Sequence, residues 1–297
     1  MAISGFNSYV GTDGNREDLL DIISNISPTD TPMFSRFGKT KANATYHEWM
    51  QDSLSDAASN NAIEGADFSF SVPSARTRVG NYTQIFTKTA EVTGTQEVVS
   101  KAGVKSEYSY QMQKAMKEIA RDVEYELVNS SSASGDSGTA RGFSGVLEFI
   151  SSNNETGSGT GTQALTETLY NDALQDIYDA GGNPDVTYAN GWQKRKISSF
   201  STPSTRNIDA DDKKLVASID VYESDFGLQE IILDRYMSTD TIALLEEDKW
   251  KVAVLRPFKM EEVSKVGDAK RGAIVGEMTL ESLNEAASGK ITELTTS

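Results

Sequence analysis

The strongest pattern in the chain is a run of apolar residues with helical spacing at residues 104–129. Apolar side chains recur there every three or four positions, no glycine or proline interrupts them, and charged residues occupy the other faces. About 26 helical residues form a rod of ~39 Å. The spacing predicts one long helix that packs on a sheet along one side and is solvated along the rest.

The N-terminal pattern predicts an arm rather than a domain. Residues 1–15 are rich in Gly, Ser and Asn, and a short amphipathic helix is expected to follow. Pro28 and Pro32 each push the preceding residue towards an extended conformation, so we expect the chain to leave this helix stretched. A short helix followed by an extended run buries little of itself, and we expect it to lie on a neighbouring surface. Its expected anchors are Leu20, Ile23, Met33 and Phe34.

Residues 45–93 lose the helical period and predict β-structure. Strands are expected at 46–51, 68–72 and 76–92, with a loose Ser/Asp/Ala/Asn stretch between the outer runs. This pattern favours a long two-stranded ribbon with a flexible tip. An isolated ribbon is only marginally stable in water, so other subunits are expected to cover it. The expected contact residues are Trp49, Phe68, Phe70, Tyr82 and Phe86.

A second region starts near residue 139 and mixes helices with strands. Residues 151–161 predict an exposed loop, 165–180 a helix that ends at the GGNP sequence, and 191–197 a further helical turn. The C-terminal residues are polar and predict no strand. Strands are expected at 186–188, 215–221, 228–233, 241–245, 250–255 and 273–280.

Composition narrows the possible functions of the 297-residue chain, which is long enough for one large domain or two ordinary ones. The absence of cysteine excludes disulfides and a cysteine nucleophile, and a single histidine, His47, excludes most histidine-based catalysis. A net charge of −16 opposes tight binding of nucleic acid or anionic membranes. No apolar stretch approaches the ~20 residues that span a bilayer, and no secretory signal is predicted at the start.

The candidate motifs for chemistry are weak. His47 alternates with aromatic residues and is interpreted as an ordinary strand residue. The acidic residues 209–212 lack the glycine and distal glutamate of a calcium loop, and the glycine-rich residues 157–161 lack the lysine of a phosphate-binding loop. Lys194 and Arg195 belong to the one tight basic cluster, which either meets an acidic neighbouring subunit or caps a helix end. We therefore predict no catalytic, cofactor-binding or metal site.

Two stretches resemble the major capsid proteins of tailed phages. Residues 19–23 (LLDII) and 26–34 (ISPTDTPMF) are similar to the N-terminal signature of that family. Residues 180–185 (AGGNPD), 193–197 (QKRKI) and 199–200 (SF) are similar to its central segment. The predicted order of elements also resembles the Hong Kong-97-type shell fold.

The resemblance implies an α+β fold with five parts. These are an N-terminal arm at residues 1–45, an extended β-ribbon loop at 46–93, and a peripheral domain with a long spine helix at 94–138. An axial domain at 139–230 and C-terminal strands at 231–297, shared by the peripheral and axial domains, complete the fold. The resemblance further implies a virion subunit, assembled in the host cytoplasm, that forms the hexamers and pentamers of an icosahedral head around double-stranded DNA without binding it specifically.

The partners implied are other copies of the chain, a separate scaffolding protein, a portal and a decoration protein. No lysine–asparagine cross-link is identified. Two alternatives stay open: another phage structural subunit, from a tail tube or baseplate, and a carboxylate-dependent hydrolase. Closed particles, stacked rings or a monomer with a concave site would distinguish the three.

Overall fold

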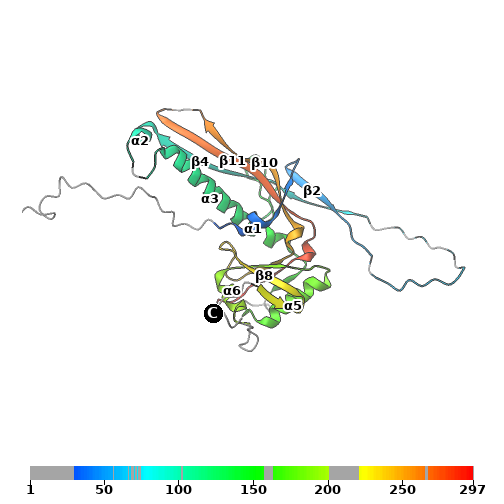
Figure 1. Cartoon of the computed structure of the whole chain (residues 1–297). Coiled ribbons are helices and arrows are strands. Elements are labelled where there is room, and N and C mark those ends of the chain that lie inside the picture. Colours follow the sequence, from blue (N-terminus) through cyan, green and yellow to red (C-terminus); the bar gives the residue numbers. More distant parts are fainter. Residues whose placement is uncertain are drawn as a thin grey trace, which may run out of the picture.

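The structure is a computed structural model, and it describes residues 30–55, 57–65, 67, 70, 72, 75–101, 103–156, 163–200, 221–264 and 267–296. The described chain forms two halves, each built on a sheet, with a ribbon and an extended loop projecting from the region where they meet (Figure 1). Several predicted features lie outside these residues: the first helix with Leu20 and Ile23, Phe68, and the motifs at 157–161 and 209–212.

The first half is a four-stranded sheet in the order β1-β10-β11-β4. Strand β1 runs parallel to β10, and β11 pairs antiparallel with both β10 and β4. Gly272 and Gly276 of β11 have no side chain because a Cβ there would collide with Tyr108 and Phe258. The strands are β1 (Gly38–Lys41), β4 (Gln84–Thr93), β10 (Trp250–Val263) and β11 (Ala269–Ser282).

The spine helix α3 (Glu107–Asn129) lies along this sheet and confirms the long-helix prediction. It begins at Ser106, whose hydroxyl accepts a hydrogen bond from the backbone N–H of Ser109 at 3.2 Å. The predicted apolar stripe is the buried face. Its buried residues include Tyr108, Met112, Ala115, Ile119, Val123 and Leu127.

The second half is a six-stranded sheet in the order β5-β12-β9-β6-β8-β7. Helices α5 (Glu167–Asp179) and α6 (Gly191–Ile197) form where the sequence predicts them. Two strands were not predicted at all: β12 in the polar C-terminal residues, which buries Ile291, and β5 in the predicted loop. A third, β7, shares only Val221 with the strand predicted at 215–221, whose other residues lie outside the described chain. The strands are β5 (Asn154–Thr156), β6 (Val186–Ala189), β7 (Val221–Ser224), β8 (Gly227–Leu233), β9 (Ile242–Leu245) and β12 (Gly289–Thr292).

The ribbon is shorter than the sequence predicts. Only β2 (Tyr46–Gln51) and β3 (Thr77–Tyr82) form it, with Tyr46 opposite Tyr82 and Gln51 opposite Thr77. The following residues leave the ribbon as β4, because β11 offers them a partner of matching length and α3 buries Phe86 and Val92. The strand predicted at 68–72 is wrong at its two described positions, 70 and 72, which belong to no strand.

A short helix, α1 (Pro32–Arg36), replaces the extended segment predicted at Met33 and Phe34. That prediction was wrong for a physical reason. Thr31 before the proline is non-helical as expected, but proline fits the first turn of a helix, where its missing N–H costs nothing. The remaining short helices are α2 (Gly94–Val98), α4 (Val146–Phe149), η1 (Glu247–Lys249) and η2 (Glu285–Ala287).

One hydrophobic core continues from the first half into the second. It contains Val123 and Leu280 beside Tyr188 and Leu245, which come from the two different halves. Phe37, the residue after α1, stacks on Trp250 and meets Tyr188 edge-on, with ring centroids 6.3 and 6.4 Å apart. The start of the described chain is therefore part of the joint between the halves.

Candidate assembly surfaces

The base of the ribbon is attached to its own chain. Gln51 donates to the carbonyl of Leu283 at 2.8 Å, and buried Asn81 donates to that of Leu280 at 2.8 Å. The indole ring of Trp49 lies 6.1 Å from the ring of Phe149. Trp49 was predicted as an inter-subunit contact, and the structure places it, half-buried, on its own body.

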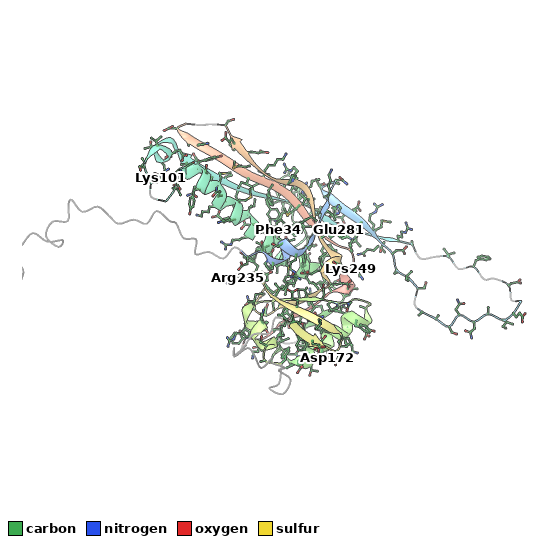
Figure 2. The ribbon with its side chains drawn as sticks, in the orientation of Figure 1. Phe34, Lys101, Asp172, Arg235, Lys249 and Glu281 are labelled. Atoms are coloured by element: carbon green, nitrogen blue, oxygen red, sulfur yellow. The ribbon has the colours of Figure 1, made fainter. Side chains whose placement is uncertain are left out.

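Beyond this base, the described loop residues expose large apolar side chains. Leu54, Ile63, Phe70 and Val72 are 98%, 85%, 95% and 95% exposed. The side chains along this loop stand away from the body in Figure 2, whereas they crowd both halves around Phe34, Lys101 and Asp172. Burying one such side chain contributes ~1.5–3 kcal/mol, and single copies rarely expose apolar surface at this density. The loop is a surface that needs a partner.

The loop is also uniformly acidic. Residues 52–75 contain four carboxylates and no lysine or arginine. The two arginines that follow are paired beside and within the ribbon, where Arg76 lies 3.3 Å from Asp52 and Arg78 lies 3.6 Å from Glu48. The tip of the loop, from Leu54 to Val72, therefore combines exposed apolar side chains with negative charge. This combination favours a partner surface that is apolar and either neutral or positive.

A second exposed apolar group lies at the far end of the first half, around α2. Val98 and Val263 are exposed there, 86% and 49% respectively. They line a shallow depression of about 630 Å³ that also contains Gly94 and Lys270. The charges around it are already paired in the chain, since Lys270 lies 3.6 Å from Glu262.

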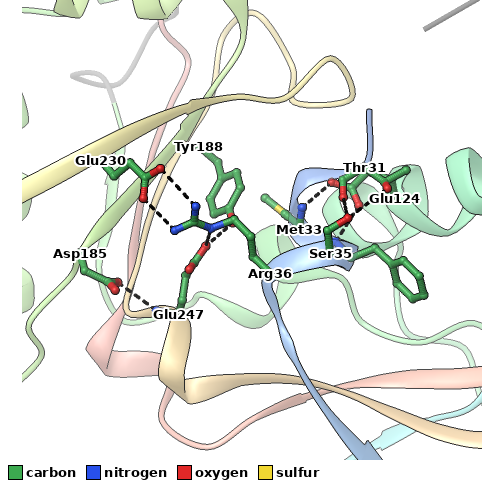
Figure 3. A network of polar contacts seen from close by, with 10 residues as sticks. Thr31, Met33, Ser35, Arg36, Glu124, Asp185, Tyr188, Glu230 and Glu247 are labelled. Carbon is green, nitrogen blue, oxygen red and sulfur yellow. Dashed lines mark hydrogen bonds and ion pairs between the residues drawn. The ribbon is translucent and has the colours of Figure 1, made fainter. Parts of the chain in front are cut away.

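The root of the arm, residues 31–37, instead packs and hydrogen-bonds within its own chain. Glu124 of the spine helix accepts hydrogen bonds from the backbone N–H groups of Met33 at 2.7 Å and Phe34 at 2.8 Å. Glu124 is fully buried, and this burial raises its pKa to about 7, while the two N–H bonds act in the opposite direction. Figure 3 shows Glu124 reaching the start of α1.

On the other side of α1, Arg36 joins the second half. Its guanidinium donates to both carboxylate oxygens of Glu230 at 3.1 and 2.8 Å, and to Glu247 at 2.7 Å (Figure 3). The hydrogen bond to Glu247 raises the pKa of Arg36 further. Tyr188 also donates to Glu247, and its pKa is raised by burial and by that bond. Helix α1 is thus bonded to both halves.

A third polar centre fastens the sheet beside the ribbon. Glu277 of β11 is nearly buried and accepts from Arg141 at 2.6 Å, Arg256 at 3.0 Å and Thr83 at 2.7 Å. Thr83 stands between the ribbon and β4. Glu277 therefore joins three segments at the point where the chain changes from ribbon to sheet.

The structure separates the predicted contact residues into groups. Met33 and Phe86 are buried in a single copy, so they are core residues with no surface for a neighbour, which corrects their assignment. Phe34 and Tyr82 are half-buried, and among the described apolar residues of the set only Phe70 is exposed to solvent. The exposed residues Leu54, Ile63 and Val72 were not among the predicted contact residues. Their apolar side chains within a Ser/Asp/Ala/Asn stretch would have indicated them.

The basic cluster at the end of α6 makes contacts within its own chain. Lys194 donates to the carbonyl of Ile231 at 3.0 Å, and the guanidinium of Arg195 lies 5.5 Å from the ring of Trp192. Its place in the last helical turn agrees with the helix-end interpretation. A contact of Arg195 with a neighbouring subunit stays a prediction.

The described residues hold no group of three or more His, Asp or Glu side chains placed to bind a metal ion. None of the helices among them is long and apolar enough to cross a membrane. His47 is a ribbon residue whose Nε2 lies 3.3 Å from Glu281.

Comparison with known proteins identifies the family of this chain. The family model described as SU10 major capsid protein matches residues 5–295, nearly the whole chain. The chain belongs to the SU10 major capsid protein family. It is similar to the major capsid protein of Escherichia phage Phieco32, with 25% identity over 337 aligned positions that cover 96% of this chain and 95% of the relative.

Solved structures show the fold of this capsid protein. The capsid asymmetric unit of cyanophage A-1(L) matches with a TM-score of 0.71 at 14% identity, over 98% of this chain and 100% of that one. An encapsulin complex from Synechococcus elongatus matches with a TM-score of 0.60 at 10% identity, over 99% and 98%. The predicted α+β, Hong Kong-97-like shell fold is confirmed, and the protein is a major capsid subunit of the virion shell.

Proposed function

We propose that this capsid protein builds the hexamers and pentamers of an icosahedral head around double-stranded DNA by placing its extended loop on a neighbouring copy. The nearly complete exposure of Leu54, Phe70 and Val72 carries this proposal. These side chains are costly to leave in water, and the loop projects too far from its own body to bury them there. Repetition of one modest contact around a closed shell stabilises the whole strongly.

We propose that the two halves are the peripheral and axial domains that the resemblance implied, with shifted boundaries. We assign the four-stranded half with α3 to the peripheral domain, and the six-stranded half to the axial domain near the capsomer centre. Strands β10, β11 and β4 support the first assignment, since they form one sheet beside the spine helix. Strand β12 returns to the second sheet, so the last residues serve the axial domain.

The protein acts through assembly rather than catalysis, and it encloses DNA without holding it tightly. A net charge of −16 supports this, because phosphate binding needs a local excess of lysine and arginine. A separate scaffolding protein, a portal and a decoration protein remain proposed partners, inferred from the family resemblance alone.

Electron microscopy of the purified full-length chain, expressed alone or with its neighbouring virion proteins, tests the proposal. Closed particles with hexameric and pentameric units are the expected result. Rings that stack into open tubes would replace the head assignment with a tail-tube assignment. A persistent monomer under every assembly condition would contradict the proposed role of the loop.

A further inference from the structure

An exposed apolar patch lies where the described chain begins. Asp30, the first described residue, lies 3.6 Å from Arg235, which Figure 2 places at the junction of the two halves. Near Arg235 in the chain, Leu233 at the end of β8 is 51% exposed. Tyr236 meets Tyr125 of α3 edge-on, with ring centroids 6.4 Å apart, and Tyr125 is 52% exposed. We call Leu233, Tyr125 and Tyr236 the tyrosine patch.

Hydrogen bonds fix the tyrosine patch without covering it. The backbone N–H of Tyr236 donates to Asp234 at 2.8 Å, and its carbonyl accepts from the Asn129 side chain at 3.0 Å. Its phenol oxygen accepts from Nε of Arg121 at 3.0 Å. The patch is therefore preformed, and a segment that binds it does not have to order these rings.

The edge of the patch carries an unpaired positive charge. Among the described residues Arg121 forms no ion pair, and its nearest acids are Glu118 and Asp122. Both acids already have partners, since Glu118 lies 3.7 Å from Lys114 and Asp122 lies 2.8 Å from Lys88. In a chain with a net charge of −16, this edge favours an acidic partner.

The segment that precedes Asp30 has the matching pattern. The sequence predicts a short amphipathic helix there, and residues 17–29 contain no lysine or arginine. Its apolar positions are Leu19, Leu20, Ile22, Ile23 and Ile26, and its acidic positions are Glu17, Asp18 and Asp21. Four chain steps separate Ile26 from Asp30, so the apolar stripe begins within ~14 Å of the carboxylate that meets Arg235.

We propose that residues 17–26 dock on the tyrosine patch of their own chain, with the apolar stripe over Leu233 and the two rings and with acidic side chains beside Arg121. The short connection keeps the segment at high local concentration over its own patch, which favours that patch over the same patch on a neighbouring copy. Leu20 and Ile23 then anchor the arm to its own subunit, in contrast to the exposed tip of the loop.

Thiol labelling of the full-length, unassembled subunit tests this docking. The chain contains no cysteine, so Leu233→Cys introduces a single thiol within the patch. A small alkylating reagent reaches a docked thiol only when the segment leaves. Adding Ile22→Ser/Ile23→Ser breaks the stripe, and we expect labelling of Leu233→Cys to become about tenfold faster. Ser24→Ala, on the opposite face of the predicted helix, is the matched control and should leave the rate unchanged.

Two more thiols and a dilution series complete the test. Val98→Cys, exposed at α2 on the far end of the first half, should label at one rate with or without the intact stripe. Tyr125→Cys is the second reporter if Leu233→Cys fails to fold. Protection by the same chain stays constant on about hundredfold dilution. Protection that fades on dilution would assign the segment to a neighbouring copy, and equal labelling with an intact or a broken stripe would show no docking. Either result would overturn the proposal, and neither depends on shell formation.

Discussion

The root of the arm and the tip of the loop differ in where their apolar side chains lie. The root buries them within its own chain, whereas the tip leaves them in solvent. At the root, Met33 and Phe37 are buried and every charge around α1 has an internal partner or is shielded from water. At the tip, Leu54 and Phe70 stay in solvent. The difference separates what one copy completes by itself from what it leaves for a neighbour. A major capsid protein needs both, since a subunit must fold before it assembles.

The largest expected effect comes from removing the apolar character of the tip. In the double variant Leu54→Ser/Phe70→Ser we expect the yield of closed shells to fall at least tenfold, because each lost burial is worth ~1.5–3 kcal/mol and is repeated at every loop. Electron microscopy and sedimentation measure the yield. The unfolding free energy of the subunit should change by less than about 0.5 kcal/mol. Ser55→Ala, in the same loop, is the matched control, and normal shells from the double variant would refute the contrast.

The opposite effect is expected at the root. Met33→Ala should lower the unfolding free energy by ~2–5 kcal/mol, because it leaves a cavity in a core that cannot collapse freely. Phe70→Ala removes a larger side chain, yet it should leave the stability of the unassembled subunit unchanged. Urea unfolding of both variants measures the difference. Similar losses of stability in the two would mean that the tip is packed on its own body.

Glu277 sharpens the comparison at the boundary between ribbon and sheet. Glu277→Gln weakens its bonds to Arg141 and Arg256, whose side chains are 28% and 54% exposed. Because water partly compensates both arginines, we expect a loss of only ~1–2 kcal/mol in the unfolding free energy. Denaturant midpoints measure it against Glu262→Gln, an exposed carboxylate paired with Lys270 that should show no change.

The smallest effect is expected at Arg36. Arg36→Met keeps the apolar stem and removes the bonds to Glu230 and Glu247, and since all three side chains reach solvent we expect ~0.5–1 kcal/mol. The thermal midpoint of the subunit measures this loss. A fall as large as that of Met33→Ala would show that the polar bonds, and not the buried side chains, hold the two halves together.

Much of the regular structure was predictable because it depends on local periodicity. The apolar stripe of α3, the stripe of α5 and the short strands β6 and β9 appear within a few residues of their predicted positions. The two helices bury a single face, so the spacing of their apolar residues follows the helical period. Strands β6 and β9 are buried at every position, and a short run of apolar residues predicts such strands. The −16 charge and the lack of cysteine also excluded whole classes of chemistry before any fold was known.

The partners of each segment were decided only by the tertiary structure. The sequence of β4 also fits a two-stranded ribbon, but β4 pairs instead with β11, which lies almost two hundred residues later in the chain. Met33 reads as a surface anchor until Glu124, 91 residues away, fixes the short helix that buries it. Local sequence determines which residues are apolar and at what spacing along the chain they recur. Which surface buries them depends on contacts between distant segments and, in the function we propose for the loop tip, on another copy of the chain.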